Sequence, residues 1–235
     1  MKHEGISVKN AIKYLGGFYH DLEQMWSVLE NHLLENSMIL HPAQGNKTGF
    51  SYPLSNDIQR GGSWLLRNIQ RYFVPEDRSD KAEQVLTDRS IVMSVSLYEN
   101  SLFEFPVIMA GVIKYKNEVS LNDIWNYWLW SEICSLDTGR NSWRFNDSAS
   151  ARGPVYKLKT ISQRKIYDKK NLIENIIDYI EVYFIDLVKL ANTESVISAV
   201  NPIIEIFHNN ESYTFPDNSL IVTSLPELLI KEWSR

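Results

Sequence analysis

Arginine and lysine residues gather between positions 140 and 170, with aromatic residues among them. This segment holds nine Lys or Arg residues and two Asp residues, a net charge of +7, whereas the rest of the chain sums to −12. Cations neutralise phosphates and aromatic rings stack on bases, so the composition suits single-stranded nucleic acid. It also suits an acidic protein surface, or a solvated loop with no specific ligand. The candidate nucleic-acid-binding residues are Arg140, Arg144, Arg152, Lys157 and Lys159.

A second cluster, of aromatic residues, lies at positions 125–130, where three tryptophans and a tyrosine fall on an expected helix. Three tryptophans so close together cannot all face one core. Trp and Tyr are frequent at binding hot spots, because they bury a large area and keep a polar group. Packing against another part of the same chain is the alternative. The candidate partner-binding residues are Tyr127, Trp130, Arg140, Trp143 and Arg144.

The sequence contains no recognisable catalytic motif and no resemblance to a known family. Its five histidines form no HExxH or HxH pattern, its one cysteine cannot build a thiolate zinc site, and GxSxG and GxGxxG are absent. We therefore expect no catalytic residue, no metal ligand and no cofactor. A metal-dependent phosphodiester hydrolase is the remaining enzymatic alternative, because carboxylates beside a lysine can hold a divalent cation and stabilise phosphate charge. The residues that would serve this role flank an expected hairpin and are Asp88, Glu99, Glu104 and Lys114.

The hairpin itself is the clearest strand signal in the chain. Residues 91–99 alternate between two sets of side chains, and residues 106–116 form the return strand after a turn. Pro106 suits the first position of a strand, where no ladder hydrogen bond is lost. Gly111 predicts a bulge or a close backbone approach. We expect this antiparallel hairpin, residues 90–116, at the centre of a sheet.

A long apolar segment at residues 171–191 is expected to form the central helix. Its apolar residues, including Ile177, Ile180 and Phe184, recur at steps of three and four. They make a face roughly 160° wide, which is wider than a surface helix needs. The pattern therefore predicts a buried helix lying against the sheet, with a coiled-coil dimer as the alternative.

Further helices are expected at both ends of the chain. Residues 7–15 and 18–35 are predicted to form two helices, broken or bent at Gly16 and Gly17, the second with a stripe from Phe18 to Leu33. Residues 63–73 predict a helix that stops before Pro75, with an arginine ridge opposite its buried face. Residues 195–200 and 201–208 are predicted as two consecutive helices. The residues of the ridge are Arg60, Arg67 and Arg71.

These elements predict an α+β fold, in which a small antiparallel sheet packs against several helices. The chain of 235 residues fits one domain, and its helical first part, about residues 1–75, could form a subdomain. No signal peptide or membrane span is expected, and the low cysteine content fits the cytoplasm.

Taken together, these features favour a non-catalytic cytosolic interaction protein, a subunit or inhibitor within a larger protein assembly. A protein partner is expected, with no membrane association, and self-association stays open. The first alternative is a nucleic-acid-binding subunit that uses residues 140–170, and the second is the metal-dependent hydrolase.

Overall fold

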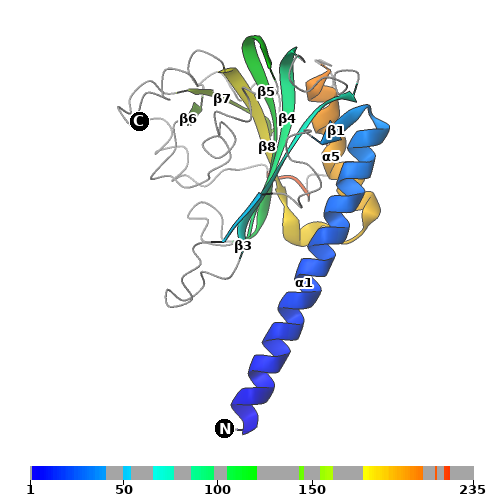
Figure 1. The fold of residues 1–235 in the computed structure, drawn as a ribbon, viewed down its shortest axis with the longest axis vertical. Coiled ribbons are helices and arrows are strands. Elements are labelled where there is room, and N and C mark those ends of the chain that lie inside the picture. The colour runs from blue at the N-terminus through cyan, green and yellow to red at the C-terminus, as the bar shows by residue number, and fades with distance from the viewer. Residues whose placement is uncertain are drawn as a thin grey trace.

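Within the residues that the structure describes, an antiparallel sheet and two α-helices form the body of the molecule (Figure 1). The computed structural model describes residues 2–40, 50–53, 66–76, 86–97, 105–120, 143–145, 154–160, 177–208, 215 and 220–222. The expected α+β class is confirmed, although two α-helices rather than several occur within these ranges. In chain order the elements are α1 (Lys2–Glu35), β1 (Met38–Leu40), β2 (Phe50–Pro53), β3 (Leu66–Pro75), β4 (Leu86–Ser96), β5 (Val107–Ser120), β6 (Trp143–Phe145), β7 (Tyr156–Thr160), β8 (Ile177–Asp186), the 3-10 helix η5 (Leu187–Lys189) and α5 (Thr193–Phe207).

In the described part of the chain, the sheet has eight strands in the order β1-β3-β4-β5-β8-β7-β6, and β2 also pairs with β3. The described pairings are antiparallel. The predicted hairpin is confirmed as β4 and β5, which pair from Ser90 opposite Ile113 to Ser96 opposite Val107. It lies at the centre of the sheet, as expected.

The prediction of a central helix at residues 171–191 is wrong. Residues 177–186 form strand β8, which lies between β5 and β7. Ile177, Ile180 and Phe184 are fully buried, so their burial was predicted correctly in the wrong element. Residues 182–185 of β8 are consecutive apolar residues buried on both faces, so they show no apolar–polar alternation, and the apolar residues of the whole strand also satisfy helical spacing. These β-branched and aromatic residues favour a strand.

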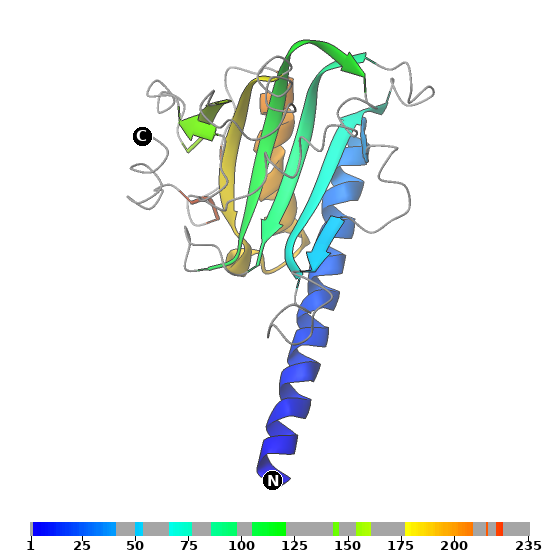
Figure 2. The same ribbon diagram turned by 60° about the vertical axis from the view of Figure 1, so that its left-hand side comes forward.

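One face of the sheet is covered by α1 and α5 (Figure 2). Alternate residues of the central strands, such as Ile91, Met93 and Ala110, join the core formed with these helices. Tyr183 is fully buried there, and its hydroxyl donates to the carbonyl oxygen of Ala199 in α5 at 2.8 Å. This hydrogen bond fixes α5 against β8.

The opposite face of the sheet is buried as well, and it is packed tightly at Gly111. A Cβ atom built at Gly111 would lie 2.9 Å from Val182 Cγ1 and 3.2 Å from Val92 Cγ1. The close approach expected for this glycine is therefore present, because the neighbouring strands place branched side chains on both sides of it.

Helix α1 is continuous from Lys2 to Glu35, so the predicted break between two helices is wrong. Gly16 and Gly17 lie inside it, each weakening the helix by about 1 kcal/mol without ending it. The predicted stripe is confirmed, since the apolar residues from Leu22 to Leu33 are buried and Phe18 packs beside them. The N-terminal half extends beyond the end of the sheet (Figure 1).

Two further predictions need correction. Residues 66–75 form strand β3 and not part of a helix 63–73, so the expected arginine ridge does not exist as a helical surface. Tyr72, Phe73 and Val74 are all buried, which is typical of a strand with both faces covered. Residues 193–207 form one helix, α5, and Pro202 lies inside it. Asn192 and Ser195 make the capping box that starts α5, upstream of the predicted start.

Candidate interaction surfaces

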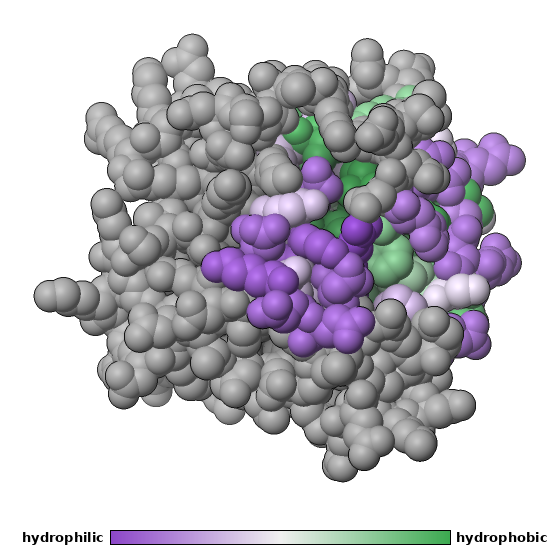
Figure 3. Space-filling model, turned by 90° about the horizontal axis from the view of Figure 1, so that it is seen from above, coloured by the Kyte–Doolittle hydropathy of each residue, from purple (hydrophilic) through white to green (hydrophobic). Residues whose placement is uncertain are grey.

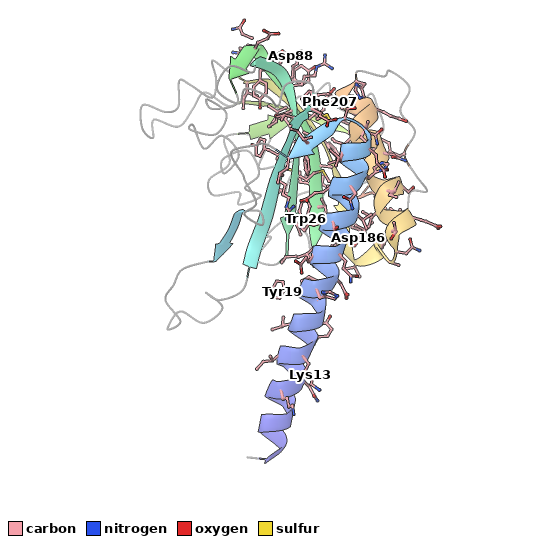
Figure 4. The ribbon with its side chains drawn as sticks, turned by 45° about the vertical axis from the view of Figure 1, so that its right-hand side comes forward. Lys13, Tyr19, Trp26, Asp88, Asp186 and Phe207 are labelled. Carbon is pink, nitrogen blue, oxygen red and sulfur yellow. The ribbon has the colours of Figure 1, made fainter. Side chains whose placement is uncertain are left out.

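The half of α1 that extends past the sheet presents apolar side chains to solvent. We call residues 2–17 the arm. Ile12 is 63% exposed and Tyr14 is 75% exposed, and Lys9 and Lys13 are exposed as well. Figure 4 shows Lys13 on this part of the helix, beyond the end of the sheet. A helical segment of about 16 residues is marginally stable in water without packing, so the arm is suited to contact with another surface.

Charge changes sign along α1. The arm contains three lysines and one glutamate, whereas residues 18–35 contain four acidic residues and no Lys or Arg. Asp21 and Glu23 are exposed in this second half. The helix therefore presents a basic end and an acidic end to any partner that lies along it.

Polar contacts fix the second half of α1 to the body. The guanidinium of Arg71 in β3 forms an ion pair with Glu30 and lies 5.0 Å from the ring centroid of Trp26. Burial lowers the pKa of Arg71 from its ordinary value. His32 Nε2 donates to Asn201 Oδ1 at 2.6 Å, which joins α1 to α5. The direction in which the arm leaves the body is thus set by contacts with both β3 and α5.

A polar cluster lies at the opposite end of the molecule, at the upper ends of β4, β5 and α5 (Figure 4). Seen from above, hydrophilic residues gather at this end (Figure 3). Asp88 forms ion pairs with Lys114 and with Arg89, whose Nε lies 3.6 Å from Asp88 Oδ2. Arg89 Nη1 also donates to the carbonyl oxygen of Phe207 at 2.9 Å. Helix carbonyls at a C-terminus lack internal partners, so Arg89 caps α5 from the sheet.

The charged side chains of this cluster are paired with one another and join elements of the fold. Burial acts to raise the pKa of Asp88, but the hydrogen bond and charge of Lys114, together with the charge of Arg89, hold it below its ordinary value. The Asp88 carboxylate is already paired with cations. Among the residues that the structure describes, no group of three or more His, Cys, Asp or Glu side chains could hold a metal ion.

The residues named for a hydrolase are only partly placed. The structure brings Asp88 and Lys114 together as an ion pair at the end of the hairpin. Glu99 and Glu104 lie outside the described residues. The observed geometry therefore supplies one carboxylate and two cations, which join elements of the fold.

Two described parts of the basic segment, β6 and β7, lie at one edge of the sheet. Strand β6 is the last in the strand order and pairs with β7, so that Arg144 lies opposite Lys159. Lys157 lies opposite Glu181 of β8. Because strand positions alternate between faces, positions 144, 157 and 159 share one face of the sheet. The register thus brings together three of the five residues predicted to bind nucleic acid.

Of the other predicted binding residues, Trp143 is the one within the described part of the chain. Trp143 and Arg144 are adjacent in β6, so they occupy opposite faces of the strand. The other predicted binding residues lie outside the described part of the chain, and these are Tyr127, Trp130, Arg140 and Arg152.

The arm is the surface that the sequence reasoning missed. Residues 7–15 were expected to be an ordinary amphipathic helix separated from the next by two glycines. Two signals were available: Tyr14 lies off the apolar stripe of the expected helix, and the charge changes from basic to acidic across Gly16. Neither signal reveals that the body ends near Phe18, since that depends on the length of the strands.

Comparison with protein-family models, with curated protein sequences and with solved structures finds no match. Within the described ranges, no helix is both long enough and apolar enough to cross a membrane.

Proposed function

We propose that this protein is a non-catalytic interaction protein, and that the arm is the element that binds its partner. The observation that carries the proposal is that half of a 34-residue helix extends beyond the body with Ile12 and Tyr14 exposed. The other half is anchored by a buried stripe, an ion pair and a hydrogen bond to α5. Such an arrangement presents a helical surface in a fixed direction, which suits recognition by helix packing.

The polar side chains of the body support a binding role in a different way. Asp88, Arg89 and Lys114 connect β4, β5 and α5, and Arg71 connects β3 to α1. Each of these groups has a partner that explains its position in the fold. The arm, in contrast, carries exposed apolar side chains whose positions the body does not explain.

The proposal is tested by measuring the size of the complex that the full chain forms in extracts of its native source. We expect a complex larger than the monomer by gel filtration with light scattering. The double variant Ile12→Ser, Tyr14→Ser should lose this complex, because it removes two strongly exposed apolar side chains of the arm. Val188→Ser is the matched control, since Val188 is 70% exposed but lies in η5 on the body. A lone monomer, or a complex that survives the double variant, would contradict the proposal.

A second candidate function is nucleic-acid binding at the edge formed by β6 and β7. The observation that favours it is the register, which places Arg144 beside Lys159 and puts Lys157 on the same face. Binding of a labelled single-stranded oligonucleotide should weaken steeply with salt, because each phosphate contact releases counterions. Arg144→Glu with Lys159→Glu should abolish it, whereas Lys13→Glu, on the arm, should not. Binding that is absent or insensitive to salt would remove this candidate.

A further inference from the structure

A line of five residues along α1 has the spacing of a helix-packing seam. Steps of three, four, three and four residues place these positions within roughly 80° of one another around the helix axis. We call them the seam. They are Lys9, Ile12, Gly16, Tyr19 and Glu23.

The seam lies beside the buried stripe of α1 and not on it. It is turned by roughly 110° from the stripe that runs through Leu22, Leu29 and Leu33. Lys9, Gly16 and Glu23 are exposed, and Ile12 is 63% exposed. Tyr19 is half-buried, with its ring against Phe18 at 5.7 Å between centroids. A second helix could therefore follow the seam from the arm as far as Glu23, one heptad before Glu30, which is paired with Arg71 of β3.

The seams of two α1 helices are complementary in charge when the helices run antiparallel. If two such helices run antiparallel and cross at Gly16, Lys9 of each lies opposite Glu23 of the other, and Ile12 lies opposite Tyr19. A parallel pair would instead place Lys9 opposite Lys9 and Glu23 opposite Glu23. Like charges oppose pairing, so the charges select the antiparallel arrangement.

The glycine at the crossing point permits a close approach. A Cβ atom built at Gly16 or Gly17 would meet nothing within 4 Å, so the monomer's own packing does not require either glycine. Gly16 lies on the seam, whereas Gly17 is turned away from it by about 120°. Small residues at a helix crossing let the two backbones come together.

We propose that the arm binds a second copy of this chain, and that two α1 helices pair antiparallel about a two-fold axis at Gly16. This inference rests on the proposed function and names the partner. The interface is isologous, since Lys9 contacts Glu23 and Glu23 contacts Lys9. It therefore closes as a dimer and leaves no repeating surface for further growth.

The first experiment compares two leucine substitutions by sedimentation equilibrium of the purified full chain. Gly16→Leu should abolish the dimer, because the new side chain separates the helices at their crossing. Gly17→Leu should leave the dimer intact, although it makes the same chemical change one residue away. Both variants have open space for the new side chain. Circular dichroism should show that both variants keep their fold.

The second experiment exchanges charges. Lys9→Glu and Glu23→Lys should each weaken the dimer about tenfold or more, because each turns two symmetric attractions into repulsions. Combining both changes should restore the wild-type dissociation constant. Lys13→Glu lies off the seam and should have no comparable effect.

Three results would overturn the inference: a wild-type chain that stays monomeric at high concentration, equal effects of the two leucine substitutions, or failure of the double charge exchange to restore pairing. The proposed function can be judged separately. If the pure chain is a monomer but its native complex is lost in the Ile12→Ser, Tyr14→Ser variant, the arm binds a different partner and only self-pairing is wrong. If the dimer forms and depends on Gly16, both proposals are supported.

Discussion

At the residue scale, two glycines in this chain have opposite surroundings, one tightly packed and one open. Gly111 lies at the centre of the sheet between branched side chains, and a Cβ atom there would approach Val182 within 2.9 Å. Gly17 lies in α1, where the same atom would meet nothing within 4 Å. The sequence alone shows a single type of residue in both places, and only its surroundings decide what it does.

We predict that Gly111→Ala destabilises the protein by about 1–3 kcal/mol, because Val92, Ile180 and Val182 have stiff side chains that cannot easily move aside. Gly17→Ala should instead stabilise α1 by up to about 1 kcal/mol through helix propensity. Chemical denaturation of both variants checks the pair. Equal changes in the free energy of unfolding would contradict the tight packing described at Gly111.

At the element scale, the contacts of Arg71 hold α1 to β3. The guanidinium pairs with Glu30 and lies over Trp26, and it is mostly buried. We predict that Arg71→Met costs about 2–4 kcal/mol, since it leaves the Glu30 carboxylate partly buried without its cation. Glu30→Gln combined with Arg71→Met should recover part of this loss, because the uncompensated charge is then gone. Denaturation of the single and double variants measures the coupling. Strictly additive losses would show that the two side chains act independently.

The elements that the sequence predicted well are those whose apolar residues follow one clear period. The stripe of α1 from Leu22 to Leu33 and the β4–β5 hairpin both emerge from simple periodicity. Strands β3 and β8 were misassigned as helices because their apolar residues also recur at steps of three and four. Ile177, Ile180 and Phe184 fit a helix and a strand equally well, and the pairing with β5 that decides between them is a long-range contact.

The candidate surfaces also differ in whether they depend on local sequence or on long-range contacts. The basic residues 144, 157 and 159 were predicted from composition, but their meeting at one sheet edge depends on strand register. Register cannot be obtained from charge alone. The seam of α1 is local and could have been found, had the two glycines not suggested a break.

At the scale of the whole molecule, two fully buried tyrosines connect stability to alkaline pH. Burial raises the pKa of Tyr115, which also shares a 2.7 Å hydrogen bond with Ser90, and burial likewise raises the pKa of Tyr183. A raised pKa in the folded state means that the stability is fully present below the unfolded value of about 10 and declines as pH rises above it.

We therefore predict that the free energy of unfolding falls steeply above about pH 10, with tyrosine ionisation accompanying the loss of structure. Absorbance of tyrosinate and circular dichroism should change together. Tyr183→Phe should make the decline shallower, whereas Tyr14→Phe, at a residue 75% exposed, should not. Complete ionisation of all tyrosines in a still folded protein would contradict the burial of these hydroxyls.

The length of the arm has a geometric consequence. A helix rises about 1.5 Å per residue, so sixteen residues form a spacer of about 24 Å. A molecule bound near the tip of the arm would be held away from the sheet, at the end of the molecule opposite the polar cluster around Asp88 (Figure 4). A partner bound near the tip of the arm would therefore leave the Asp88 end of the molecule uncovered.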